Sequence, residues 1–152
     1  MLPSEHAVYL VSQLGSRLGM WQLSFDENNL LQVRVGETFL DIQFDAKKDL
    51  FLISSEVAVL SSSSIAEVYA HILEFNLVAG LLARQGFIGL NRNSEQLFYI
   101  DHIVASHLTA DAFEDFVRHA AKIATAWSKL ISSPEFLKDA LAINAAPAGN
   151  VG

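Results

Sequence analysis

The 152-residue chain contains no cysteine and only three prolines, and few of its residues are charged. Without cysteine, disulfide bonds, thiolate chemistry and cysteine-type zinc sites are excluded. No apolar run approaches the ~20 residues of a membrane-spanning helix, and the best stretch is residues 77–82. Residues 1–5 lack the basic start of a signal peptide. We therefore expect a cytoplasmic protein with no membrane partner.

The sequence has 17 acidic and 10 basic residues, which gives a formal net charge of −7. Binding of nucleic acid requires cations opposite the phosphates. No cluster of lysine or arginine supplies them, so we expect no nucleic-acid partner. Hydrophobic residues make up 51% of the chain, which excludes disorder over most of it. Such an apolar chain must cover its apolar surface, and self-association or a hydrophobic partner does so most simply.

Local patterns predict one helix and three strands in the first 60 residues. Ser4 is a suitable N-cap, apolar residues recur after it at helical spacing, and Gly19 is suited to end the helix. Apolar and polar residues then alternate over 31–35 and 40–44, and an apolar segment follows at 50–60. These patterns predict strands, and the short connections favour an antiparallel meander.

The second part of the chain predicts two helices around a hairpin. The helices span 65–85 and 110–131, the second capped by Thr109, and the hairpin strands span 88–91 and 97–104. The serine run at 61–64 is either a flexible linker or a loop whose last serine caps the next helix. The immediate start of a helical pattern favours the loop.

The resulting order is α-β-β-β-α-β-β-α, an α+β fold with a mainly antiparallel sheet. The length predicts one domain, which we place at residues 1–133. Residues 134–152 begin with a proline and become small and polar, so we expect a partly flexible C-terminal tail.

The predicted helix at 65–85 is apolar on more than one face, and only Glu67, His71 and Glu74 form a narrow polar strip. A surface helix of a small monomer would bury a single stripe, so this helix requires cover on two sides. Either the rest of the chain wraps it, or the sheet covers one side and an identical subunit covers the other. We favour the homodimer.

The predicted strands carry apolar side chains on both faces. Phe39 points opposite Leu40, and Phe51 points opposite Leu50 and Leu52. A sheet that is apolar on both faces must cover both. Either the first helix covers the second face, or part of that face awaits a ligand.

No catalytic motif is present. The sequence has no glycine-rich phosphate loop, no ATP-binding signature and no Gly-x-Ser-x-Gly. The five histidines have neither the HExxH nor the facial-triad spacing of metal sites. Glu114 and Asp115 are adjacent on a predicted helix and so point ~100° apart, which keeps them from sharing a site. We therefore expect no enzyme activity, no cofactor and no metal.

A series of short motifs occurs in order along most of the chain. They comprise residues 14–15, 18–20, 23–26, 31–33, 73–77, 86–91 and 97–99, followed by Phe113, Phe116 and Trp127. Over residues 8–130 the sequence resembles the class I type III secretion chaperones, the Tir chaperone family of Gram-negative bacteria. The order and spacing of the motifs, the acidity and the size carry the resemblance together. Nothing carries over onto the tail.

The resemblance implies the α-β-β-β-α-β-β-α fold, a homodimer and no catalysis. It implies that the protein holds the N-terminal segment of a secreted effector in extended form in the bacterial cytoplasm. The effector would stay soluble and competent for export without ATP. The candidate effector-binding residues are Val8, Val11, Leu14, Leu31, Val33 and Phe39. The candidate dimer-interface residues are Val68, Ile72, Phe75 and Leu77.

Two other functions remain open. A dimer of the same fold could sequester a transcription regulator or an anti-activator of the secretion system, and no residue separates this role from that of an export chaperone. A small enzyme or ligand-binding domain with an apolar pocket would need convergent polar groups, and the sequence contains no pattern that predicts them.

Overall fold

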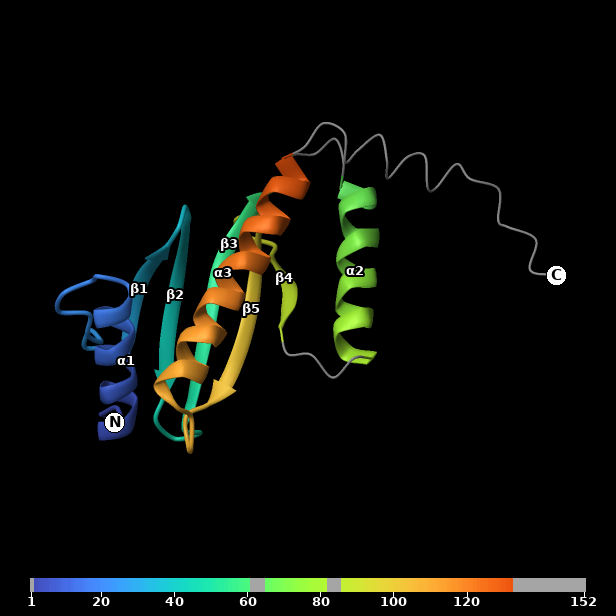
Figure 1. Ribbon diagram of the computed structural model, residues 1–152. Helices are drawn as coiled ribbons and strands as arrows, with labels where there is room; N and C mark the ends of the chain where they lie inside the picture. The colour runs from blue at the N-terminus through green and yellow to red at the C-terminus, as the bar shows by residue number, and fades with distance from the viewer. Residues whose placement is uncertain (1, 61–64, 82–85, 133–152) are drawn as a thin grey trace.

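The computed structural model describes residues 2–60, 65–81 and 86–132. The elements are α1 (Glu5–Arg17), β1 (Leu30–Val35), β2 (Thr38–Asp45), β3 (Leu50–Val59), α2 (Ile65–Leu81), β4 (Phe87–Asn91), β5 (Gln96–Val104) and α3 (Ala110–Ser132) (Figure 1). The predicted order of helices and strands is confirmed. The serine run, the last four residues of the predicted helix 65–85 and the predicted tail lie outside the described residues.

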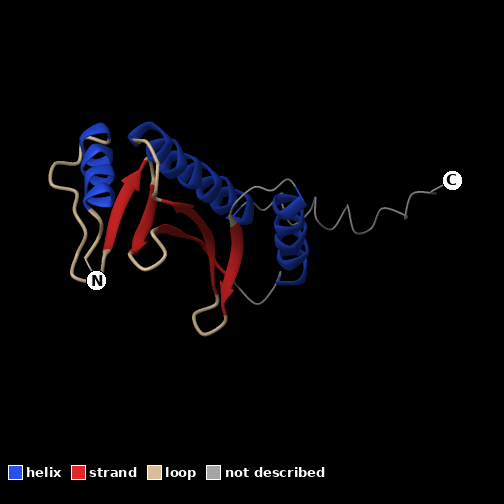
Figure 2. Ribbon diagram, turned by 90° about the horizontal axis from the view of Figure 1, so that it is seen from below, coloured by secondary structure: helices blue, strands red, loops and turns tan. Residues whose placement is uncertain are grey.

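The five strands form one antiparallel sheet in the order β1-β2-β3-β5-β4. Helix α3 crosses one face of this sheet (Figure 1). Helix α1 contacts α3 and lies beside β1, whereas α2 lies beyond β4 at the other edge (Figure 2). The described helices therefore leave the second face of the sheet uncovered.

The core lies between the sheet and the helices α1 and α3. Phe51 is fully buried there, with its ring centroid 4.4 Å from that of Phe113 on α3 and 5.0 Å from that of Phe44 on β2. Leu10 and Leu14 of α1 belong to the same core. Because α1 packs into this layer, it does not cover the second face of the sheet.

We call this uncovered second face the bare face. Because strand neighbours alternate, the register assigns it a set of polar and apolar side chains. They include Gln32, Phe39, Asp41, Gln43, Leu52, Glu56, Phe98, Ile100 and His102. The prediction that Phe39 points opposite Leu40 is confirmed, since Phe39 is 55% exposed and Leu40 is fully buried.

Helices α1 and α3 begin at the predicted N-caps. Ser4 Oγ accepts a hydrogen bond from the amide of Ala7, and Thr109 Oγ1 accepts one from the amide of Ala112, both at 3.1 Å. Such bonds satisfy amides that have no partner within the helix. No helix in the described part of the chain is both long and apolar enough to cross a membrane.

An ion-pair network joins α1 to α3. Arg17 donates to Glu114 at 2.8 Å and also pairs with Asp111, while Arg118 donates to the other oxygen of Glu114 at 2.8 Å. The hydrogen bonds from Arg17 and then Arg118 lower the pKa of Glu114 below its ordinary value. The hydrogen bonds to Glu114 and then to Asp111 raise the pKa of Arg17. The network fixes the end of α1 against the start of α3.

Candidate functional site

The two edges of the sheet differ in how their backbone groups are satisfied. At the β4 edge, the side chain of Asn76 on α2 closes the strand. The amide of Ile88 donates to Asn76 Oδ1 at 2.9 Å, and Asn76 Nδ2 donates to the carbonyl of Ile88 at 3.1 Å. A helix side chain thus replaces part of the next strand. An incoming strand would have to break both bonds to pair with β4 there.

Within the described residues, the β1 edge is closed by hydrogen bonds at its start. Asp26 binds Leu30 there, accepting from the Leu30 amide at 2.9 Å and donating its own amide to the Leu30 carbonyl at 2.8 Å. Beyond Leu30, the strand borders no further strand among the described residues. An edge strand of this kind presents a row of backbone donors and acceptors that can pair with another extended chain.

An apolar groove of about 300 Å³ lies between α1 and the segment that leads into β1. Its apolar lining comes from both sides and comprises Leu2, Pro3, Val8, Val11, Leu23 and Phe25. Asp26 and Glu27 also line the groove, and they lie just before β1 in the chain. Trp21 lies in the loop just before Leu23 and is 92% exposed. The groove and the β1 edge therefore share the turn at residues 26–29.

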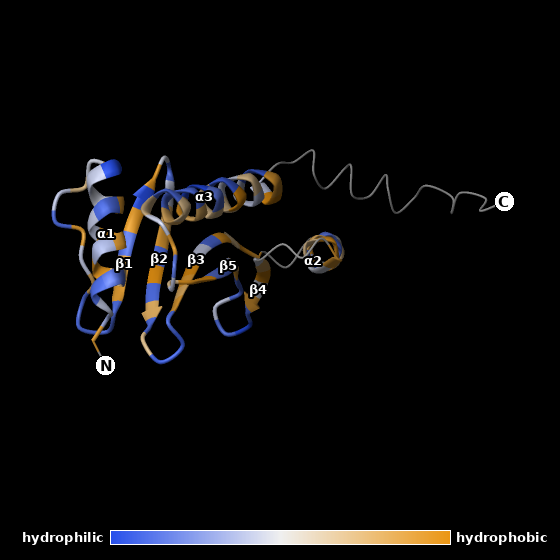
Figure 3. Ribbon diagram, turned by 60° about the horizontal axis from the view of Figure 1, so that its bottom comes forward, coloured by the Kyte–Doolittle hydropathy of each residue, from blue (hydrophilic) through white to orange (hydrophobic). Residues whose placement is uncertain are grey.

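Helix α2 exposes a second apolar surface. Its largest exposed side chains are Leu73, Leu77, Val78 and Leu81. Three of them, at positions 73, 77 and 81, follow one another by one turn of helix and so form a continuous stripe. Apolar residues are distributed around much of this helix (Figure 3). We call Leu73, Leu77, Val78 and Leu81 the α2 stripe.

Residues 9–128 match the model of one protein family, described as the Tir chaperone protein (CesT) family. The match spans most of the sequence. The chain belongs to the Tir chaperone protein family. No curated protein matches the sequence.

Solved structures share the fold of this Tir chaperone family member. The crystal structure of the ExsC–ExsE complex covers 86% of this chain and 96% of its own, at a TM-score of 0.71 and 19% identity. The match to the HopA1–SchA chaperone–effector complex covers 82% of this chain and 94% of the matched chain, with a TM-score of 0.65 and 15% identity. The match to the Yersinia pestis type III secretion chaperone SycH, solved in complex with a stable fragment of YscM2, covers 79% of this chain and 98% of the matched chain. Its TM-score is 0.61 and the identity is 12%.

In this family member, the predicted effector-binding residues separate into two groups. Val11 and Leu14 on α1 and Leu31 and Val33 on β1 are buried in the core of their own chain. Of these four, only Val11 also borders the groove. Val8 borders the groove and is 51% exposed. Phe39 is exposed too, on the bare face.

The predicted dimer-interface residues separate in the same way. Val68 and Ile72 are buried within the chain, and the ring of Phe75 meets that of Trp127 edge-on at 5.2 Å. Leu77 is 61% exposed and belongs to the α2 stripe. An interface on α2 stays a prediction, and exposure favours Leu77 and its neighbours in the stripe over the other three residues.

Two features of the family member were not predicted from sequence. Asn76 lies between the apolar residues Phe75 and Leu77. A polar amide in such a position indicates that its side chain forms a hydrogen bond with a buried polar group. Trp21 lies outside any periodic pattern, which is a signal for an exposed aromatic. Neither signal identifies the partner, because the partner is distant in sequence or belongs to another molecule.

A buried polar pair was also missed. The hydroxyl of Tyr99 donates to Asp101 Oδ2 at 3.0 Å, and the amide of His102 donates to Asp101 Oδ1 at 2.7 Å. Burial, followed by the charge of Asp101, raises the pKa of Tyr99 well above its ordinary value. Gly86, at a φ of +97°, lies so close to the Tyr99 ring that a Cβ there would fall 2.4 Å from the hydroxyl oxygen. The Tyr99 ring therefore leaves no room for a side chain at residue 86, immediately before β4.

Proposed function

We propose that this protein is a type III secretion chaperone that binds the N-terminal segment of a secreted effector in extended form. Membership of the Tir chaperone family supports the proposal, and the HopA1–SchA relative is a chaperone–effector complex. The observation that carries it is the β1 edge, which borders no further strand among the described residues and adjoins an apolar groove. Such a chaperone acts without ATP, in the bacterial cytoplasm, before the effector is exported.

The geometry suits an extended client. A client strand beside β1 gains main-chain hydrogen bonds, which depend little on its sequence, while alternate side chains enter apolar pockets. Val8, Leu23 and Phe25 supply such a pocket. The carboxylates of Asp26 and Glu27 and the net charge of −7 favour a basic client segment.

We propose further that the chaperone is a homodimer whose two copies meet through the α2 stripe. Leu73, Leu77 and Leu81 would otherwise remain in water, at a cost of about 25 cal/mol for each Å² of apolar surface. The stripe lies on the side of α2 that its own chain leaves exposed. A second copy of the same stripe is self-complementary, as a twofold interface requires.

The test uses the intact chain with an affinity tag, purified from the host while its secretion system is expressed. Proteins that co-elute are identified, and the N-terminal segment of each secreted candidate is then made and mixed with the purified chain. We expect this segment to bind and the rest of the effector not to bind. Emission of the exposed Trp21 should shift on binding, and a Trp21→Phe variant removes that signal because Trp127 is buried.

A matched pair of variants locates the binding surface. Val8→Asp changes the groove, whereas Val104→Asp changes a similarly exposed valine at the end of β5. We expect Val8→Asp to weaken binding of the effector segment, and we expect the Val104→Asp variant to bind the segment as tightly as the wild type does. Equal binding by both variants would count against the groove. Recovery of a DNA-binding regulator with no secreted protein would favour the regulatory alternative.

A further inference from the structure

Strands β2 and β3 pair over only part of their length. Their register runs from Asp45 opposite Leu50 to Asp41 opposite Ser54, although both strands continue. From Ser55 onward β3 pairs with β5 alone, and a register shift between Glu56 and Ala58 indicates a bulge. A bulge bends and twists the strand that contains it. The strands therefore diverge beyond Asp41.

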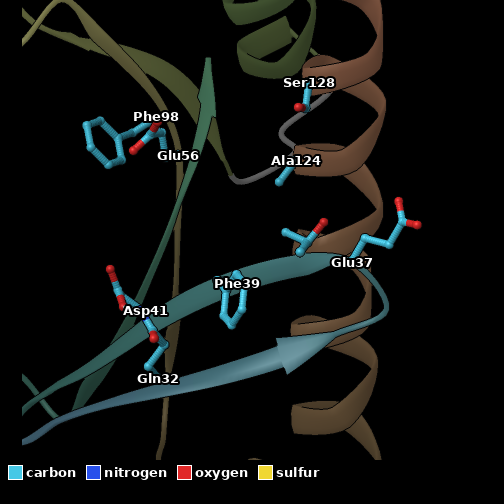
Figure 4. A pocket seen from close by; sticks show the side chains of 9 residues that line it. Gln32, Glu37, Phe39, Asp41, Glu56, Phe98, Ala124 and Ser128 are labelled. Atoms are coloured by element: carbon cyan, nitrogen blue, oxygen red, sulfur yellow. Dashed lines mark hydrogen bonds between the residues drawn. The ribbon is translucent and has the colours of Figure 1, made fainter. Parts of the chain in front are cut away.

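The divergence opens a cleft of about 470 Å³ between the two strands (Figure 4). Residues Ala124 and Ser128 of α3 form part of its wall. Where the next ladder bond would be, Ser55 Oγ donates to the carbonyl of Phe39 at 2.8 Å. This bond satisfies the carbonyl without filling the cleft.

Two aromatic rings and three carboxylates line the cleft. Asp41 and Glu56 lie on the bare face with the two rings, whereas Glu37 belongs to the turn between β1 and β2. Figure 4 places Phe98 and Glu56 on one side and Phe39 and Asp41 on another. The carboxylate of Asp41 accepts from Gln32 Nε2 at 2.9 Å, and that of Glu56 accepts from Gln96 Nε2 at 2.8 Å. Each of these two carboxylates thus has a neutral amide as partner, and within the described residues neither has a lysine or arginine within 4.0 Å.

We propose that this cleft receives the side chain of an arginine from the bound effector segment. A guanidinium is planar, stacks on aromatic faces and donates in pairs to carboxylates, so it matches rings and acids that border one opening. The guanidinium of Arg34 already lies over the Phe39 ring, 5.6 Å from its centroid, so we assign the stacking of the incoming guanidinium to Phe98. The amide partners of the two carboxylates leave acceptor sites for a charged donor.

The position of the cleft connects it to the proposed effector path, on whose proposed function this inference rests. Gln32, which borders the cleft, belongs to β1, the strand beside which the effector segment is proposed to lie. A segment that leaves the β1 edge across the bare face passes the cleft. The arginine would therefore fix the direction and register of a segment whose apolar contacts carry little sequence information.

The test uses a small probe and does not require the effector. Nα-acetyl-arginine amide is titrated into the isotope-labelled full chain and followed by NMR, with the neutral isostere Nα-acetyl-citrulline amide as comparison. We expect arginine to shift the amide signals of Phe39, Asp41, Glu56 and Phe98, and to do so more weakly as salt is added. Citrulline should leave these signals in place.

A double variant tests the carboxylates. Asp41→Asn with Glu56→Gln keeps the shapes and an acceptor oxygen for each glutamine partner, and we expect arginine to bind at least ~10-fold more weakly. The control, Glu74→Gln with Asp115→Asn, removes two exposed carboxylates elsewhere and should bind as the wild type does. Circular dichroism verifies that all of the variants are folded.

Three results would overturn the inference. The first is that the arginine and citrulline probes shift the amide signals equally. The second is that the two double variants lose equal affinity for the arginine probe. The third is that arginine shifts the amide signals of all exposed aspartates and glutamates alike. The proposed function fails by a different observation, namely that no effector segment binds the purified chain. The two failures are therefore distinguishable.

Discussion

The side-chain amide of Asn76 binds both backbone groups of Ile88, accepting from its amide at 2.9 Å and donating to its carbonyl at 3.1 Å. A residue of α2 thereby closes the edge of the sheet that β4 forms. The edge that β1 forms has such closure only at Leu30 in the described residues. Asn76 thus attaches α2 to the sheet, with the α2 stripe exposed, and leaves β1 as the edge at which we propose that the client pairs.

Substitution of Asn76 should release the β4 edge. We expect Asn76→Ala to lower the free energy of unfolding by about 1–3 kcal/mol, because Ile88 is buried and its backbone groups lose their partners. Hydrogen exchange of the Ile88 amide should accelerate. Asn76→Asp keeps an acceptor for that amide and should leave its exchange slow. Equal protection of the Ile88 amide in Asn76→Ala and the wild type would contradict the role of Asn76.

The wild type should be a dimer at micromolar concentration, and Leu77→Asp should dissociate it. An unpaired carboxylate in an apolar interface costs several kcal/mol, so we expect association at least ~100-fold weaker. Size-exclusion chromatography with light scattering measures the mass. Val104→Asp, at a similarly exposed position, should remain a dimer, and a monomeric wild type would reject the interface.

Phe75→Asp should lower the stability of the fold, whereas Leu77→Asp should mainly weaken association. The Phe75 ring packs edge-on against Trp127, so the introduced charge would enter the chain's own packing. We expect a lower midpoint of urea unfolding for Phe75→Asp and a midpoint for the Leu77→Asp monomer that is closer to the wild type. Identical midpoints in the two variants would contradict the assignment of the two residues to different faces of α2.

Val33→Asp and Val8→Asp separate the core from the groove. Val33 is 1% exposed, and an unpaired carboxylate there should cost about 3–5 kcal/mol and unfold much of the protein. Val8 is 51% exposed, so Val8→Asp should change stability by no more than about 0.5 kcal/mol. Circular dichroism and thermal unfolding distinguish the two. A folded Val33→Asp would show that β1 packs differently.

Tyr99→Phe should destabilise the core by about 1–3 kcal/mol, because Asp101 would lose the hydroxyl donor while it stays buried.

The raised pKa of Tyr99 predicts that stability depends on pH. The folded state keeps its hydroxyl proton above the ordinary value of 10, so the free energy of unfolding should fall as the pH rises past that value. Urea unfolding at increasing pH measures this fall, which should be shallower in Tyr99→Phe.

Glu114 should contribute to stability in the opposite direction of pH. Its pKa is lowered from 4.5 by Arg17 and then Arg118, so the contribution is present above 4.5 and is lost as the pH falls through the lowered value. We expect Glu114→Gln to be less stable than the wild type at neutral pH and the difference to shrink below pH 4.5. A difference that does not change with pH would contradict the ionic origin. Asp115→Asn, next along α3, is the control.

The sequence by itself determined the order of elements, the caps at Ser4 and Thr109, and the alternation along the strands, because these depend on neighbours within a few residues. The order of short motifs was likewise enough to identify the Tir chaperone family. What alternation cannot decide is which face of a strand another element will cover. Leu40 and Phe39 are both apolar neighbours, yet only Leu40 is buried.

Only the tertiary structure decided which apolar residues are available to a partner. Around α2 the periodicity is nearly uniform, so the separation of Val68 and Ile72 from Leu73 and Leu77 depends on where β4 and α3 lie. The closure of Ile88 by Asn76 and the cleft beyond Asp41 also join residues distant in sequence. Burial is set by packing between distant segments, and a local pattern contains no information on which segments those are.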